Sequence, residues 1–136
     1  MRTLTLLASC TLAACASQPL PPVDLNKAWV DMFTNNGRLV MAERLDGQRL
    51  EDGRYFQLTP GSHELVVRFD YELFVPGGFA TEPAERLCYI TLRYDGFQAG
   101  QRYRLEARSI STHVSARLMD AGKRIVAEDR QINCLP

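Results

Sequence analysis

The chain has 136 residues, the size of one domain. Its 16 basic and 16 acidic side chains give a formal net charge of zero at pH 7. It therefore has no overall basic field of the kind that attracts nucleic acid. With two histidines and four cysteines, and no paired cysteine spacing, we also expect no zinc site and no cofactor.

Residues 1–14 have the pattern of a secretory signal peptide. Arg2 supplies the one charge, and an apolar run from Thr3 to Ala14 follows. This run is well short of the roughly 20 residues that a membrane-spanning helix needs. We therefore expect the segment to be removed.

Leu12-Ala13-Ala14-Cys15 closes this run and resembles a bacterial lipobox, which implies lipidation of the Cys15 thiol. Leu7-Ala8-Ser9-Cys10 is a poorer version of the motif, because it leaves a much shorter apolar run. An ordinary secretory signal with incidental cysteines is the alternative. Ala16 stands where, in Gram-negative lipoproteins, Asp would favour retention at the inner membrane. The expected location is therefore the periplasmic face of the outer membrane, with the bilayer as a partner through the lipid.

Residues 15–26 combine the lipidated cysteine with a Pro-rich tether, since Pro19, Pro21 and Pro22 favour an extended chain. A single domain is expected from 27 to 136. At its start, residues 28–33 fit a helix or a strand. Asn36-Gly37 favours a strand, because this dipeptide between apolar runs is typical of a hairpin turn.

The next segments alternate between apolar and polar residues. A strand is predicted over 39–44, followed by a turn at Asp46-Gly47. Thr59-Pro60-Gly61-Ser62 has the chemistry of a type II turn, with proline second and glycine third. The clearest strand covers 63–74 and places one set of residues on the core face: Leu65, Val67, Phe69 and Tyr71.

Four more short strands are predicted at 87–93, 102–109, 114–119 and 124–127, with turns around Asp95-Gly96 and Asp120 to Lys123. No segment is convincing as a long helix. The expected fold is all-β: an antiparallel β-sandwich of about seven or eight short strands.

Between the strands, residues 73–83 form an expected loop that is longer than a hairpin needs and is rich in Gly and Pro. Phe74, Val75 and Phe79 make it the candidate partner-binding loop, because exposed aromatic residues often anchor interfaces. The alternative is that Phe74 and Phe79 fold back and plug the open end of the sandwich.

Cys88 and Cys134 are the two thiols that remain after Cys10 is removed and Cys15 is lipidated. In an oxidising compartment two such thiols usually pair, so a disulfide is predicted between them. Two free buried thiols are the alternative.

Residues 45–49 and 55–67 resemble the "DG … L-x-PG-x-H-x-L-x-V" pattern of PEGA-type β modules. Residues 97–107 and 118–123 look like the second half of small proteobacterial outer-membrane lipoproteins that share this pattern. The resemblance implies a transthyretin-like or immunoglobulin-like sandwich. Modules of this kind present surfaces or space domains at the envelope.

The chain contains no Gly-x-Ser-x-Gly elbow, phosphate-binding loop or His-Glu-x-x-His motif. His63 and Glu64 are adjacent in a strand, so they point to opposite faces. Whether His113 meets His63 stays open, and the carboxylates of Asp70, Glu72 and Asp95 are better explained as surface groups. We therefore expect no enzyme, but a non-enzymatic interaction module with an envelope protein as partner.

The alternative function is binding of a small ligand or a cell-wall glycan. Trp29 or the tyrosines would then serve as stacking platforms.

Overall fold

The computed structural model describes residues 17–74 and 82–136, and all regular elements in these ranges are strands. No helix in the described ranges is long and apolar enough to cross a membrane. The strands form one sheet in the order β3-β2-β5-β6-β9-β8-β7-β1-β4. The prediction of an all-β domain is therefore confirmed. The strands are β1 (Ala28–Phe33), β2 (Leu39–Leu45), β3 (Gln48–Arg49), β4 (Tyr55–Leu58), β5 (Gly61–Leu73), β6 (Ala84–Phe97), β7 (Arg102–Ile110), β8 (His113–Met119) and β9 (Ile125–Leu135).

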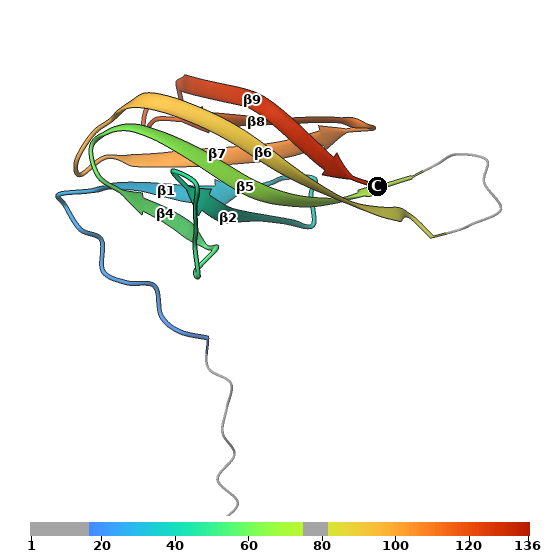
Figure 1. Ribbon diagram of the computed structural model, residues 1–136, viewed down its shortest axis with the longest axis horizontal. Coiled ribbons are helices and arrows are strands. Elements are labelled where there is room, and N and C mark those ends of the chain that lie inside the picture. The colour runs from blue at the N-terminus through green and yellow to red at the C-terminus, as the bar shows by residue number, and fades with distance from the viewer. Residues whose placement is uncertain (1–16, 75–81) are drawn as a thin grey trace, which may run out of the picture.

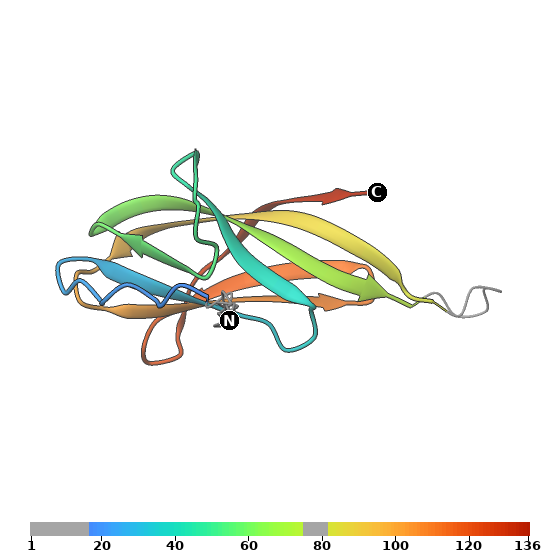
Figure 2. The same ribbon diagram turned by 90° about the horizontal axis from the view of Figure 1, so that it is seen from below.

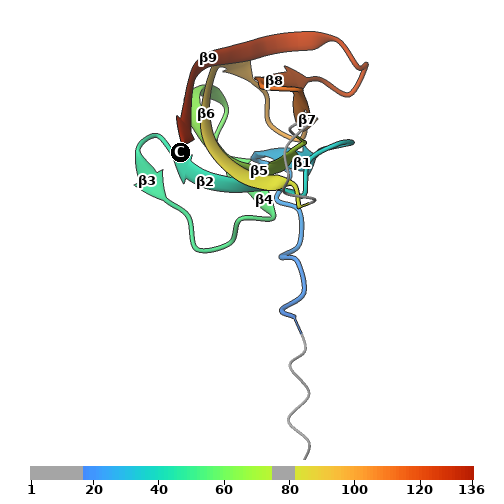
Figure 3. The same cartoon turned by 90° about the vertical axis from the view of Figure 1, so that its right-hand side faces the viewer.

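The sheet is strongly curled, and Figure 3 shows the strands arranged around a common centre. β9 joins two halves of the sheet, one made of β2, β3, β5 and β6 and the other of β1, β4, β7 and β8. Its first residues pair with β8 and its later residues pair with β6. The loop before β4 covers the free edge of β2, where the Ala42 N–H donates to the Gly53 carbonyl at 2.8 Å. The curled sheet thereby brings its two edges together.

The described sheet is mixed, so the expectation of a wholly antiparallel arrangement of seven or eight strands is wrong. β1 pairs antiparallel with β4 but parallel with β7, with Trp29 opposite Arg102. The two-residue β3 brings the described strands to nine. Side-chain alternation along a strand reports which face is buried but not which strand lies beside it. A parallel neighbour more than 70 residues away therefore leaves no local signal.

Asn36-Gly37 does not form the predicted hairpin turn. β1 is followed by bends at 35–38, and β1 and β2 pair with other strands. A Cβ at Gly37 would lie 2.2 Å from Cε2 of Phe69, which is fully buried. The glycine is therefore required by close packing. Residues 28–33 do form a strand, but through pairing with β4 and β7 and not through a hairpin at Asn36-Gly37.

The other turn predictions have different outcomes. Asp46-Gly47 is the tight turn between β2 and β3, with φ of 50° and 80° at its two residues. Both values lie in the left-handed region, as a type I′ hairpin turn requires. Asp95-Gly96, in contrast, lies inside β6, and the chain turns after Phe97 instead. Gly61 has φ of 110°, consistent with its predicted turn position.

The core fills the inside of the curled sheet. β5 contributes the four residues that alternation predicted, and all four are buried. The facing half contributes β1, β7 and β8, again through alternate residues. The inward residues of these three strands include Ala28, Val30, Tyr103, Leu105, Ala107, Val114, Ala116 and Leu118.

Candidate functional site

A two-stranded ribbon projects from one end of the sheet (Figures 1 and 2). β5 pairs with β2 as far as Asp70, and β6 pairs with β9 from Leu87 onward. Beyond these points the described parts of β5 and β6 pair only with each other, out to Leu73 opposite Ala84. The ribbon therefore leaves the curled sheet with no strand on either side.

Phe74 directly follows the ribbon strand β5, and it is 71% exposed. A large aromatic side chain exposed to this degree contributes little to the core of its own domain. Its exposure disagrees with the alternative in which Phe74 plugs the sandwich. Val75 and Phe79, the other candidate contact residues, lie outside the described residues.

Arg38 holds the base of the ribbon. Its backbone N–H donates to the Asp70 carbonyl at 2.8 Å. Its guanidinium contacts Glu72 of β5 at 3.2 Å and also pairs with Glu85 of β6. Because one cation bridges a carboxylate on each strand, it offsets the repulsion between two like charges that stand opposite each other.

Cys88 and Cys134 lie opposite each other on β6 and β9. Their sulfur atoms are 2.01 Å apart and their Cα atoms 3.9 Å apart, which is a disulfide pair. The neighbouring pair, Leu87 with Leu135, is the last contact before the ribbon leaves β9. The bridge therefore fastens the C-terminal strand at the ribbon's base. Cys15, the predicted lipidation site, lies outside the described residues.

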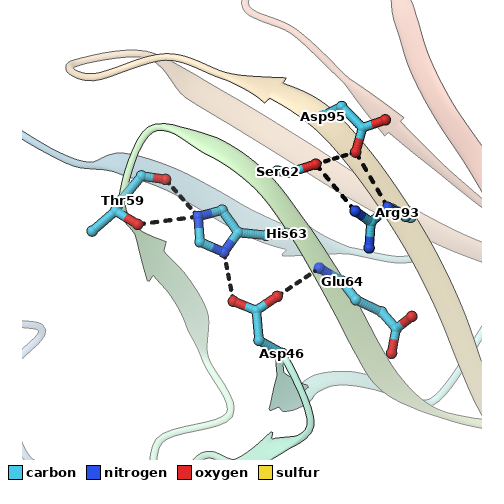
Figure 4. A network of polar contacts seen from close by, with 7 residues as sticks. All are labelled: Asp46, Thr59, Ser62, His63, Glu64, Arg93 and Asp95. Carbon is cyan, nitrogen blue, oxygen red and sulfur yellow. Dashed lines mark hydrogen bonds and ion pairs between the residues drawn. The ribbon is translucent and has the colours of Figure 1, made fainter.

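His63 is the centre of a polar network at the opposite end of β5 (Figure 4). Its Nδ1 lies 2.6 Å from Oδ2 of Asp46, and its Nε2 lies 2.7 Å from the Thr59 carbonyl oxygen. The other Asp46 oxygen accepts the Glu64 N–H at 2.9 Å. A neutral imidazole has one N–H and can donate to only one of these acceptors, whereas the imidazolium donates to both.

The same contacts shift the acidity of Asp46. Burial is the largest single influence and raises the pKa of this carboxyl. The hydrogen bonds from the Glu64 N–H and from His63 together outweigh it, so the pKa of Asp46 lies below its ordinary value. The network therefore ties the β2–β3 turn to the start of β5 by an ionised carboxylate.

These polar residues are not arranged for nucleophilic catalysis. Ser62 contacts Asp95 and Arg93, whereas both ring nitrogens of His63 are directed to Asp46 and Thr59 (Figure 4). A serine nucleophile needs a base within hydrogen-bond reach, which His63 does not offer in this arrangement.

Each of the three carboxylates considered from the sequence has an arginine partner. Asp70 is bound by Arg68 at 2.9 Å, Glu72 by Arg38 at 3.2 Å and Asp95 by Arg93 at 3.2 Å. His113 is exposed at the start of β8, where it pairs with Ile110. Among residues 17–74 and 82–136, no group of His, Cys, Asp or Glu is placed to hold a metal ion.

Trp29 does not offer a stacking platform, because it is only 4% exposed. Its ring stacks on Tyr55 at 4.3 Å between centroids, and its Nε1–H donates to Asp31 at 2.9 Å. Tyr71 and Tyr103 are equally buried. Trp29, Tyr71 and Tyr103 are therefore not exposed for stacking on a glycan, whereas Tyr55, Tyr89 and Tyr94 are partly exposed.

The described residues define a small all-β domain with a projecting ribbon and a disulfide at the ribbon's base. No protein-family model, curated protein or solved structure matches the chain.

Proposed function

We propose that this chain is a lipid-anchored, non-enzymatic interaction module of the cell envelope. Cys15 would hold it at the periplasmic face of the outer membrane, and the end of the β5–β6 ribbon would contact an envelope protein. The observation that carries the proposal is Phe74, which is 71% exposed where the ribbon strand ends. Aromatic side chains of this kind are the residues that most often anchor protein interfaces.

The placement of the N-terminal segment supports this proposal. The segment enters β1 at one end of the long axis, and the ribbon projects at the other end (Figure 1). Residues 17–26 contain no strand and carry the three prolines of the expected tether. A chain anchored through this segment could therefore present the ribbon away from the bilayer.

We infer that the two halves of the curled sheet correspond to the two layers of a sandwich, with β9 crossing between them. This description is supported by the shared position of β9 and by the residues of both halves that meet in the core. It is the arrangement that the resemblance to PEGA-type modules implies.

Anchoring is tested with Cys15→Ser and, as the matched control, Cys10→Ser. Cells expressing each variant are labelled with a fatty acid, and the full chain is followed by fractionation. Cys15→Ser should abolish labelling and leave a precursor or a mislocalised protein, whereas Cys10→Ser should be labelled normally. Labelling that persists in Cys15→Ser and disappears in Cys10→Ser would move the lipid to Cys10.

The contact surface is tested with Phe74→Ala, and Phe79→Ala extends the test to the rest of the candidate loop at 73–83. Ile125→Ala is the control, because Ile125 is an apolar residue at the start of β9 that is 49% exposed. Crosslinked partners are captured from envelopes, and the melting temperature of each variant is measured. We expect Phe74→Ala and Phe79→Ala to weaken capture with little change in melting temperature, and Ile125→Ala to change neither.

The opposite pattern would overturn the proposed surface. A large loss of stability with unchanged capture would show that these phenylalanines belong to the core of the domain.

A further inference from the structure

A groove lies on the outer face of β7 and β8, next to the turn that leads to β9. It has a volume of about 570 Å³. Four cationic residues line it, together with acidic residues that include Asp31 and Glu106. The cationic residues are Arg102, Arg104, Arg117 and Lys123.

The sheet register explains why the strand residues of the groove share one face. Arg102, Arg104 and Glu106 alternate along β7, so they share one face of the sheet. Glu106 is opposite Arg117 on β8, and Asp31 of β1 is opposite Arg104 on the other side. Three strands thus contribute to the same outer surface.

The acidic residues at the groove each have an arginine partner. Asp31 is bound by Arg102 at 2.6 Å, and Glu106 by Arg117 at 3.1 Å. Asp120 is bound by Arg124 at 3.0 Å. The hydrogen bond from Arg102 is the largest influence on Asp31 and holds the pKa of that carboxyl below its ordinary value, so the pair is ionised at neutral pH.

Two cations of the groove are left without a carboxylate among the described residues. Arg104 lies over the ring of Phe33, with 4.9 Å between its guanidinium carbon and the ring centroid. Lys123 is exposed in the turn after β8. Neither forms an ion pair within the described part of the chain. Arg104 also lowers the pKa of the opposite Asp31 by its charge, but each carboxylate of the groove is already paired with another arginine, so the groove keeps an excess of positive charge.

Arg117 adds unused hydrogen-bonding capacity. Its Nη2 reaches Glu106, but its buried Nε has no hydrogen-bond partner in the described structure. A buried donor left without a partner is unfavourable, so a modest movement of this guanidinium toward an additional acceptor would be favoured.

We propose that this groove binds a phosphate group, with Arg104 and Lys123 as its charge partners. A phosphate monoester carries a charge of about −1.5 to −2 at pH 7, which matches two uncompensated cations better than the single charge of a carboxylate does. The arginine fork and the lysine ammonium are both established means of binding phosphate oxygens. The phosphate could belong to a soluble molecule or to a lipid headgroup. This proposal does not depend on the ribbon or on the identity of its partner.

Binding is measured by calorimetry on the full chain in non-ionic detergent, with inorganic phosphate as the probe and chloride at matched ionic strength as the reference. We expect saturable binding of phosphate and none of chloride. Arg104→Gln and Lys123→Asn should each weaken binding by about tenfold, because each removes one charged hydrogen-bonding partner. Asparagine is chosen at 123 because Lys123 has φ of 63°, which asparagine tolerates.

Arg44→Gln is the matched control, because Arg44 is exposed on β2 and lies outside the groove. It should bind phosphate as the unaltered chain does, and the melting temperature of each variant shows whether it is folded. Absence of saturable binding of inorganic phosphate, together with no Arg104-dependent binding to the vesicles described below, would overturn the proposal. So would equal weakening by all three substitutions, which would indicate only a general charge effect.

Vesicles distinguish the two sources of phosphate. The full chain is mixed with phosphatidylcholine vesicles that contain or lack phosphatidic acid, whose headgroup is a phosphate monoester. Binding that requires phosphatidic acid and is reduced in Arg104→Gln supports a lipid source. Phosphate binding in solution without any vesicle binding supports a soluble source. Vesicle binding that Arg104→Gln and Lys123→Asn leave unchanged, together with no binding of inorganic phosphate, contradicts the site.

Discussion

At the scale of single residues, Asp46 has two structural roles in the same turn. Its backbone has φ of 50°, a conformation that aspartate tolerates better than most residues. Its carboxylate then accepts hydrogen bonds from both His63 and the Glu64 backbone. One short acidic side chain thus closes the β2–β3 turn and fixes it to β5.

This network predicts that part of the domain's stability depends on pH. The pKa of Asp46 is lowered in the folded chain, so folding favours the ionised carboxylate. The stabilisation is complete above the ordinary pKa of 3.8 and is lost as the pH falls through the lower, folded-state pKa. Urea unfolding of the full chain, measured from about pH 6 to about pH 2, checks this expectation.

Asp46→Asn should be less stable than the unaltered chain near neutral pH and should lose less stability on acidification. Glu51→Gln is the control, since Glu51 is an exposed carboxyl shortly after β3. Parallel pH profiles for Asp46→Asn and the unaltered chain would contradict the role of Asp46.

At the scale of elements, β7 extends beyond the end of its neighbour β1. The pairing of β1 with β7 ends at Phe33 opposite Glu106. Three residues further on, the Asn36 side chain accepts the Ser109 N–H at 3.2 Å and donates to the Ser109 carbonyl. Asn36 and Ser109 keep the sequence separation of 73 residues that relates Trp29 to Arg102. A side-chain amide therefore continues the β1–β7 pairing where β1 has ended.

Asn36→Ala should expose this part of β7 to solvent exchange. Loss of the amide removes both partners of the Ser109 backbone, so the Ser109 N–H should exchange with solvent faster while the Leu105 N–H, deep in β7, stays protected. The global free energy of unfolding should fall by only about 0.5–1.5 kcal/mol, the usual net value of a hydrogen bond. Hydrogen exchange followed by NMR measures both effects. Unchanged exchange at Ser109 would show that Asn36 is dispensable for this pairing.

At the scale of the whole molecule, the disulfide joins the last strand to the middle of the sheet. Cys88 and Cys134 are 46 residues apart in sequence, and β9 lies between the two halves of the fold. Loosening β9 would therefore affect both halves together.

Removal of the bridge should lower the free energy of unfolding by about 4 kcal/mol, the value that loop-closure entropy gives for a loop of this length. Cys88→Ala combined with Cys134→Ala is compared with the unaltered chain in urea, with and without reductant. Reductant should lower the unfolding midpoint of the unaltered chain and leave that of the double variant unchanged. A reductant-insensitive midpoint in both proteins would show that the bridge contributes no stability.

By itself the sequence determined the all-β class, the buried face of β5, the turn at Asp46-Gly47 and the pairing of Cys88 with Cys134. These features depend on neighbouring side chains, on glycine conformation or on the number of available thiols, and all three can be read along the chain. The sequence also singled out Phe74, and the structure places it exposed at the end of the ribbon strand. Lipidation at Cys15, and the part of the loop that contains Val75 and Phe79, stay predictions.

Only the tertiary structure decided which strands are neighbours and which side chains meet. It placed β1 beside β7, buried Trp29, gave Asn36 a partner on β7 and lined one groove with both Arg104 and Lys123. Each of these contacts joins residues far apart in the sequence, and each depends on strand order and register across the curled sheet. Alternation along a single strand is the same for any choice of neighbour, so it carries no information about that order.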